Sequence, residues 1–185
     1  MKKLIILLII FTVQLGNAQD DKGISVFHRL LILNSNNELL VVKIENTDFW
    51  VTPGINQNSE QTIKQGLNSI SETYGIKTES PELKGVFLLK RDINDVMTTS
   101  LRNVYTAKLA NGKLKKPTGI EEAKWVSVQD ALKIITFPHI NAMIEKITNN
   151  PNQVWGGTLL QFKEKNVWKT KLLEDFYVFS ELKTK

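Results

Sequence analysis

The first third of the chain alternates between apolar runs and short polar breaks. Residues 24–33 and 39–44 are largely β-branched or apolar, and the polar segment 34–37 lies between them. Apolar runs of this length on either side of an Asn-rich break are typical of paired β-strands. We therefore expect a hairpin here, followed by a turn at Pro53-Gly54.

A helix is expected after this turn. Four apolar residues recur at spacings of four, three and four, as on one face of a helix: Ile63, Leu67, Ile70 and Tyr74. Ser59 is a suitable N-cap residue, and Gly75 stands where a left-handed C-cap belongs. The pattern predicts a helix over residues 60–74 with these four side chains buried.

The next part of the chain adds two strands and two helices. Strands are predicted over residues 83–89 and 104–109, with the polar run 92–103 between them. One helix opens at Val128, and a second spans residues 137–148 before the Asn-Asn-Pro segment stops it. This mixed order favours an α+β fold over a regular alternation of strands and helices.

The tail of the chain, residues 151–185, is rich in strand-forming residues. Two or three strands are expected between residues 158 and 179, with a turn at Lys165-Asn166. We expect the tail to pack as an extension on the domain formed by residues 19–150. An open strand edge is also a surface where two copies of a chain can pair, so a homo-oligomer through these strands is left open.

The first 18 residues have the pattern of a secretory signal peptide. Lys2 and Lys3 precede an apolar run over residues 4–13, and the small residues Gly16 and Ala18 follow. The run is shorter than the about 20 residues that cross a bilayer. We predict cleavage after Ala18 and export to the periplasm or the medium, without stable membrane insertion; the alternative is an uncleaved anchor.

Composition narrows the function classes. An apolar fraction of 42% and a charged fraction of 23% are typical of a folded globular domain. The absence of cysteine excludes disulfides and thiolate metal sites. Without Lys2 and Lys3, the chain has 22 of its 24 basic residues against 19 acidic ones, and this small excess is scattered. A nucleic-acid partner is therefore not expected.

The segment from Gly54 to Ile76 resembles the catalytic box of the Nudix hydrolases. That box reads Gly, five residues, Glu, seven residues, then Arg-Glu-apolar-any-Glu-Glu-any-Gly-apolar. The matching residues keep this register without an insertion: Gly54, Glu60, Ile70, Glu72, Gly75 and Ile76. Asn68, Ser69 and Thr73 stand where the family has Arg, Glu and Glu.

The flanks of the box extend the resemblance to residues 24–147. Residues 49–54 are similar to the family's aromatic-x-x-Pro-Gly approach, and residues 121–126 to its acidic segment followed by tryptophan. The resemblance implies a mixed β-sheet sandwiched by helices, to which the C-terminal hairpin region is added. It also implies a cleft that takes a small phosphorylated compound, which Trp50 and Gly54 would border; Trp50 is otherwise a core residue.

The resemblance implies a Mg²⁺ site on the box helix, and the substitutions weaken it. Residues 69, 72 and 73 share one helix face, where the family has three glutamates and this chain has one. Glu72 would be the main ligand and catalytic carboxylate, assisted by Glu60 and by Glu121 or its neighbour Glu122. Each has a plainer interpretation as a solvated surface carboxylate, and Glu60 would also suit a helix N-terminus. His28 and His139 lack ligand partners at metal spacing and are interpreted as packing or surface residues.

Two functional hypotheses follow. One is a Mg²⁺-dependent hydrolase of nucleoside-diphosphate-linked or other organic diphosphates, with reduced activity. The other is a non-catalytic module of the cell envelope that binds a ligand or partner in the same cleft. The predicted export and the absence of two of the three box glutamates favour the second hypothesis. The first is favoured because most members of the family that the chain resembles are hydrolases.

Overall fold

The computed structural model of the protein describes residues 24–181. The predicted signal peptide therefore lies outside the described residues. These residues form ten strands and three helices: β1 (Ser25–Leu33), β2 (Leu39–Ile44), β3 (Trp50–Val51), β4 (Gly54–Asn56), α1 (Ile63–Thr73), β5 (Ile76–Thr78), β6 (Glu82–Ile93), β7 (Val96–Gly112), β8 (Ile120–Val126), α2 (Val128–Ile134), α3 (Pro138–Asn149), β9 (Gln153–Glu164) and β10 (Val167–Glu181). None of the helices in this part of the chain is long and apolar enough to cross a bilayer.

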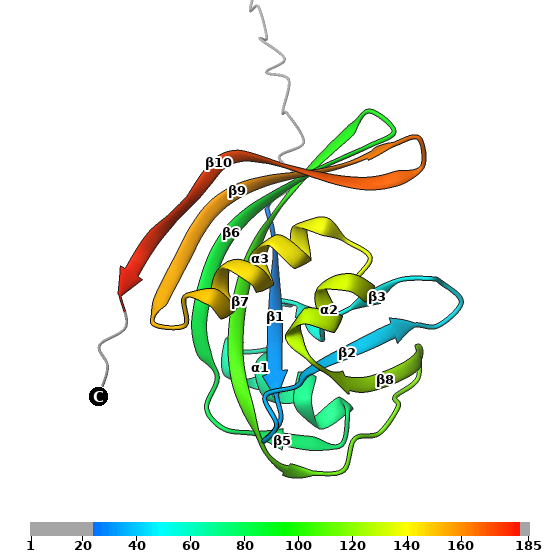
Figure 1. Ribbon diagram of the computed structural model, residues 1–185, viewed down its shortest axis with the longest axis vertical. Helices are drawn as coiled ribbons and strands as arrows, with labels where there is room; N and C mark the ends of the chain where they lie inside the picture. The colour runs from blue at the N-terminus through cyan, green and yellow to red at the C-terminus, as the bar shows by residue number, and fades with distance from the viewer. Residues whose placement is uncertain (1–23, 182–185) are drawn as a thin grey trace, which may run out of the picture.

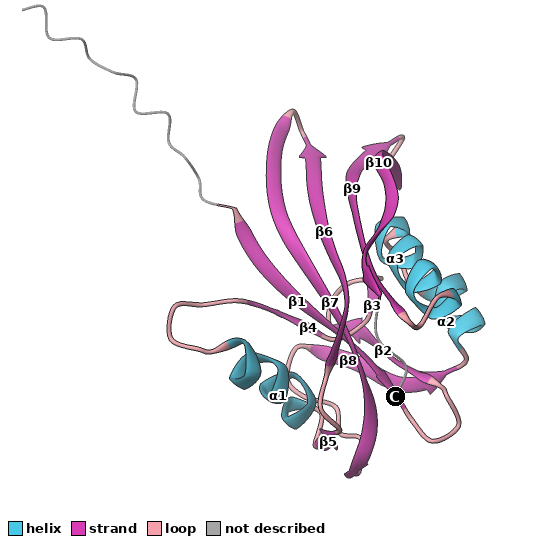
Figure 2. Ribbon diagram, turned by 90° about the vertical axis from the view of Figure 1, so that its left-hand side faces the viewer, coloured by secondary structure: helices cyan, strands magenta, loops and turns pink. Residues whose placement is uncertain are grey.

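The strands form one mixed sheet between two helical layers. Its order is β10-β9-β6-β7-β1-β2-β3, with β4 paired to β1, β5 to β7 and β8 to β2. The β1–β7 and β6–β9 pairs are parallel, and the other pairs are antiparallel. Helix α1 lies on one side of the sheet, and α2 and α3 lie on the other (Figures 1 and 2). This arrangement confirms the predicted α+β class.

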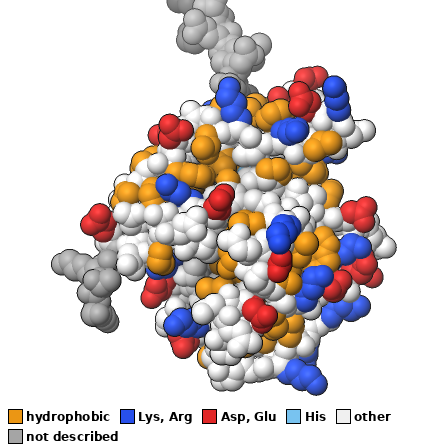
Figure 3. Space-filling view, viewed as in Figure 1, with side chains coloured by type: hydrophobic (Ala, Val, Ile, Leu, Met, Phe, Trp, Pro, Cys, Tyr) orange, Lys and Arg blue, Asp and Glu red, His pale blue; other side chains and the backbone are white. Residues whose placement is uncertain are grey.

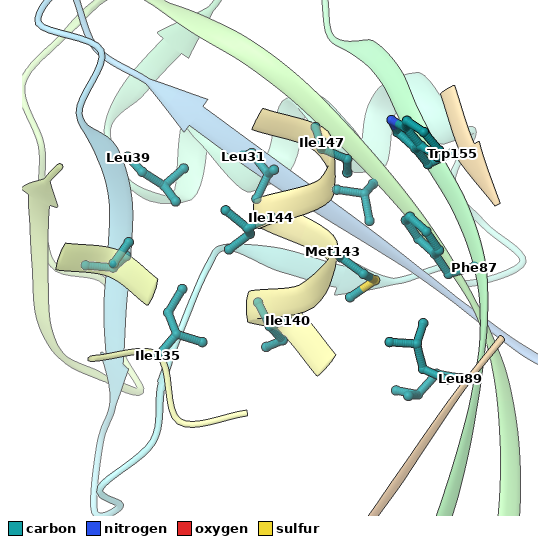
Figure 4. Close-up of a cluster of buried hydrophobic side chains, with 14 residues drawn as sticks. Leu31, Leu39, Phe87, Leu89, Ile135, Ile140, Met143, Ile144, Ile147 and Trp155 are labelled. Atoms are coloured by element: carbon teal, nitrogen blue, oxygen red, sulfur yellow. The ribbon is translucent and has the colours of Figure 1, made fainter. Parts of the chain in front are cut away.

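Strands β1 and β2 are buried on both faces because each contributes to two hydrophobic clusters. Leu31 of β1 faces α3, where Ile140, Met143 and Ile144 pack with Phe87 and Leu89 of β6 (Figure 4). Its neighbours Leu30 and Ile32 face α1 instead. This follows from the period of two along a strand, and it explains why the apolar residues run on without alternation over residues 30–33 of β1 and 39–42 of β2.

The first helix starts later than its apolar pattern predicts. Its N-cap is Thr62 rather than Ser59, because Thr62 and Gln65 form a reciprocal capping box. Leu67, Ile70 and Tyr74 are buried as expected, but Ile63 is 49% exposed. Ile63 lies in the first turn and lines a surface hollow with Lys64 and Pro81, instead of facing the sheet.

The sequence predicted that the polar run 92–103 only separates two strands, but this run is not a loop. Strands β6 and β7 continue through it, and only Asn94 and Asp95 turn, with φ angles of 53° and 60°. Polar side chains are compatible with strand here because residues 94–98, at the tip of the hairpin, are exposed and most of the others in this run are only partly buried. A turn at Lys165-Asn166, with φ angles of 48° and 63°, is confirmed between β9 and β10.

Candidate functional site

A cavity of about 390 Å³ lies where β1 and β2 separate. These strands pair only at Leu33 and Leu39, and β1 continues instead beside β7 and β4. The divergence of β2 from β1 is visible in Figure 1. The cavity is lined mainly by residues of the sheet and its loops, together with the C-cap of α1 and the start of α3. The lining residues are Phe27, Arg29, Val42, Ile44, Val51, Thr52, Pro53, Gly54, Tyr74, Arg91, Arg102, Ile120, Phe137, His139, Ile140 and Gln161. Its volume is within the usual range for a small-molecule site.

All three arginines of the chain line this cavity, on three adjacent strands. Arg29 is on β1, Arg102 on β7 and Arg91 on β6. Arg102 is opposite Phe27 in the β1–β7 register and opposite Phe87 in the β7–β6 register. Arg91 follows Phe87 and Leu89 at the period of two, so it emerges on the same face of the sheet, toward α3. Strand pairing therefore brings Arg91 close to Arg29, which lies 62 positions before it in the sequence, and to Arg102, which lies 11 positions after it.

Arg29 is held in a fixed position at the base of the cavity. Its side chain is buried, and Nη1 donates to the carbonyl oxygen of Thr52 at 2.9 Å and to the Thr52 hydroxyl at 2.7 Å. Burial, together with the charge of Arg102, lowers the pKa of Arg29 to about 9. The guanidinium is therefore still cationic at neutral pH.

Arg102 and Arg91 line the same cavity from the neighbouring strands β7 and β6. The guanidinium carbon of Arg102 lies 4.7 Å from the centre of the Phe27 ring, and that of Arg29 lies 5.2 Å from it. Burial and the charge of Arg91 lower the pKa of Arg102 to about 10. The Nε atoms of Arg91 and Arg102 are buried without a hydrogen-bond partner among the described residues.

The positive charge in the cavity has no acidic counterpart within residues 24–181 of its lining. None of the described residues that line it is Asp or Glu. The ion pairs found within residues 24–181 all involve lysine, not arginine. Buried charges are normally paired. One buried and two partly buried guanidinium groups without a carboxylate partner in the described part of the chain are therefore unusual for a purely structural cluster.

His139 adds a neutral imidazole at the start of α3. It is buried, and its Nδ1 has no hydrogen-bond partner in the described part of the chain. Burial first, and then the charges of Arg29, Arg102 and Arg91, hold the pKa of His139 well below its usual value. The sequence predicted a packing or surface role for His139; the residue is buried, and it also borders the cavity.

The predicted carboxylates do not line this cavity. Glu72 is exposed on α1, and Glu60 is exposed in the loop before the helix, where its N–H donates to the Asn58 side chain. The Glu121 carboxylate accepts a hydrogen bond from Lys43 Nζ at 2.9 Å. Within residues 24–181, no three His, Cys, Asp or Glu side chains are grouped as a metal site. The residues present do not fit a metal cluster, and the catalytic and ligand roles of these glutamates stay predictions.

Ser69 and Thr73, which stand at two glutamate positions of the box, bond to the helix itself. The Ser69 hydroxyl donates to the Gly66 carbonyl at 2.8 Å, and the Thr73 hydroxyl donates to the Ser69 carbonyl at 2.7 Å. Hydroxyls at helical positions commonly satisfy themselves in this way. On this face only Glu72 presents a carboxylate.

Of the two residues predicted to border the cleft, Gly54 lines the cavity and Trp50 does not line it. Trp50 is half-buried beside the α3-side cluster, and Lys124 Nζ lies 4.2 Å from the centre of its ring. Gly54 pairs with Arg29, and a Cβ at this position would meet the Phe27 ring and lie 2.8 Å from the His28 carbonyl oxygen. The glycine is therefore required by close packing.

Sequence reasoning missed the arginines, although one signal was present. The chain uses lysine for nearly all of its basic residues, and each arginine stands beside apolar residues of a predicted strand or at its border. Basic and acidic side chains are interspersed over the face shown in Figure 3. The preference for arginine at three inner positions is therefore distinct from the general surface charge.

Comparison with known proteins identifies the fold. No protein-family model matches the sequence, and no curated protein matches it. A MutT mutator protein from Bacillus halodurans superposes with a TM-score of 0.62 at 16% identity, over 84% of this chain and 98% of the other. A Nudix hydrolase from Nitrosomonas europaea gives 0.57 at 18% identity, over 69% and 90%. An ADP-ribose pyrophosphatase from Streptococcus suis gives 0.51 at 12% identity, over 76% and 100%. The chain has the Nudix fold.

Proposed function

We propose that this protein is an exported Nudix-fold module that binds a small phosphorylated compound in the cavity between β1 and β2. It would hydrolyse diphosphates with Mg²⁺ slowly or not at all. The observation that carries this proposal is the lining of the cavity, which includes three arginines and no carboxylate among the described residues. Arginine binds phosphate oxygens through pairs of N–H donors, whereas Mg²⁺ requires oxygen ligands.

The box helix supports the same proposal. A cluster of Mg²⁺ ions needs several carboxylates on one face, and here Glu72 stands alone between the hydroxyls of Ser69 and Thr73. Asn68 replaces the arginine that would orient such carboxylates, and an amide cannot hold a carboxylate bidentately as a guanidinium does. The apolar residues of the box, by contrast, still pack α1 onto the sheet.

A second candidate function is a Mg²⁺-dependent hydrolase of organic diphosphates. The structural relatives include an ADP-ribose pyrophosphatase, and Glu72 is exposed at the register that the resemblance gives to a ligand. Glu60 and Glu121 would assist in this case. Export favours the binding module, because free nucleotides are mostly intracellular. The proposed export rests on the signal peptide predicted over residues 1–18.

Hydrolysis assays and Mg²⁺ calorimetry on the purified protein separate the two functions. We expect weak Mg²⁺ binding, and turnover of nucleotide sugars and dinucleoside polyphosphates far below about 1 s⁻¹, the lower end of ordinary enzyme rates. Glu72→Gln is the diagnostic variant, and Glu79→Gln, which removes another exposed carboxylate, is its control. Turnover at an ordinary rate that Glu72→Gln abolishes and Glu79→Gln preserves would establish the hydrolase instead.

A further inference from the structure

We infer that Arg29, Arg91 and Arg102 form a metal-independent anion site, which binds the phosphoryl group of the ligand directly through guanidinium groups. This inference rests on the proposed function, because it assumes that the cavity takes a phosphorylated compound. Beyond that function, it identifies the residues that bind the phosphoryl group, and it requires no metal ion in this contact.

The first support is the uncompensated charge. Arg29 is 5% exposed, and the cavity lacks an acidic side chain among the described residues. A buried charge without a partner is costly in free energy, and arginine remains charged at neutral pH instead of releasing its proton. An anion that enters the cavity supplies a counter-charge, which residues 24–181 do not provide there.

The second support is that N–H donors of two arginines lack an acceptor among the described residues. Thr52 fixes the Nη1 end of Arg29, whereas the buried Nε groups of Arg91 and Arg102 have no acceptor within residues 24–181. Gln161 is directly opposite Arg91 in the β6–β9 register and is also buried against the cavity. These groups converge from β1, β7, β6 and β9 on one face of the sheet. A phosphoryl group has enough acceptor oxygens to satisfy several of them together.

The third support is the contrast between the two ends of the cavity. The arginines lie toward α3, whereas Val42 and Tyr74 belong to the cluster that packs against α1, with Ile120 at its border. Burial raises the pKa of Tyr74 to about 12, so its phenol is uncharged at neutral pH. The site therefore fits a phosphate or diphosphate ester with a compact apolar or aromatic body.

The test is calorimetric titration of the full protein with inorganic pyrophosphate and with phenyl phosphate, in excess EDTA. Arg91→Gln and Arg102→Gln are the diagnostic variants, because both side chains are only partly buried. Lys90→Gln is the matched control: it removes the same charge from the neighbouring position on β6, which faces away from the cavity.

We expect both probes to bind in EDTA, and phenyl phosphate to bind more tightly than inorganic phosphate titrated under the same conditions as a third probe. Each arginine variant should weaken binding about tenfold or more, as expected for a charged hydrogen bond, and Lys90→Gln should leave it nearly unchanged. Without ligand, the arginine variants should unfold at the same temperature as the parent protein or higher, because like charges repel. A purely structural arginine cluster would give a lower unfolding temperature.

Two results would overturn the inference. If the probes bind only when Mg²⁺ is present, or bind the parent and the arginine variants with equal affinity, the arginines are not a metal-independent anion site, although the proposed binding function stands. If neither these probes nor nucleotide sugars bind under any condition, the inference and the proposed function both fail.

Discussion

The guanidinium carbon of Arg102 lies 4.7 Å from the centre of the Phe27 ring, its direct partner across the parallel β7–β1 pair. The same ring lies 5.2 Å from the guanidinium carbon of Arg29. One aromatic side chain therefore contacts two cations that repel each other. Because the electron-rich face of an aromatic ring attracts a cation, Phe27 offsets part of this repulsion and helps to hold both arginines at the cavity.

Replacement of Phe27 by Leu tests this role. We expect the free energy of unfolding to fall by about 1–2 kcal/mol, from lost packing and lost cation–π contact. Urea denaturation monitored by tryptophan fluorescence measures it. Phe179→Leu is the control, because Phe179 is 59% exposed on β10 and should change stability by less than about 0.5 kcal/mol. Equal effects of the two substitutions would contradict the role of Phe27.

Two glycines of the box should respond to alanine in opposite directions. Gly54→Ala places a methyl group against the Phe27 ring and the His28 carbonyl oxygen, and we expect a loss of about 1–3 kcal/mol. Gly66 lies inside α1, and the nearest atoms to an added Cβ are 3.8 Å away. Gly66→Ala should therefore stabilise the protein by about 0.5–1 kcal/mol. Thermal or urea unfolding of both variants decides the point; a stabilising Gly54→Ala is incompatible with the packing described.

His139 should make the stability depend on pH in the mildly acidic range. Its pKa is lowered by burial and by Arg29, Arg102 and Arg91, which approach it from β1, β7 and β6. The unfolded chain, with a histidine pKa near about 6.5, therefore binds the proton more readily than the folded protein. The stabilising contribution is complete above about pH 6.5 and is lost as the pH falls below it, by up to about 1.4 kcal/mol per unit.

His139→Gln removes this titration and is the matching variant. Urea denaturation at about pH 7.5 and about pH 5 should show a larger loss of stability for the parent protein than for the variant. His28 is also buried, but its Nε2 contacts the Gln57 side chain at 2.9 Å, on the other face of β1. If the two proteins lose stability equally between these pH values, His139 is not the group responsible.

Restoring two box glutamates should strengthen divalent-ion binding. The double variant Ser69→Glu, Thr73→Glu places three carboxylates on one face of α1 around Glu72, and hard cations bind more tightly as carboxylate ligands are added. The change also removes two hydroxyls that only bond back to the helix. Mg²⁺ or Mn²⁺ affinity, measured by calorimetry, should rise. A third change, Asn68→Arg, is expected to be needed before hydrolysis appears, because badly oriented ligands commonly cost about 10- to 100-fold.

Adding Glu72→Gln to the double variant provides the control. Affinity for the ion should then fall back, because the central carboxylate of the face is lost. A double variant that binds Mg²⁺ no better than the parent protein would show that this face of α1 does not carry the metal site in this fold.

The sequence by itself determined the local structure, because its signals act over a few residues. The spacing of Leu67, Ile70 and Tyr74 fixed the buried face of α1, and the Lys165-Asn166 turn fixed the C-terminal hairpin. The register from Gly54 to Ile76, together with the similar flanks at residues 49–54 and 121–126, predicted the Nudix fold. The predicted start of α1 was wrong, because the Thr62–Gln65 capping box sets the N-terminus of the helix. The predicted lengths of β6 and β7 were also wrong, because both strands continue through polar residues up to the Asn94-Asp95 turn.

Only the tertiary structure decided where the charges meet. Arg29, Arg91 and Arg102 are distant in the sequence, and the registers of the β1–β7 and β7–β6 pairs bring them to one cavity. A shift of one residue in either pair would turn an arginine to the opposite face, because the side-chain period of a strand is two. Such registers depend on the packing of both faces of the sheet, and no pattern within a single strand specifies them.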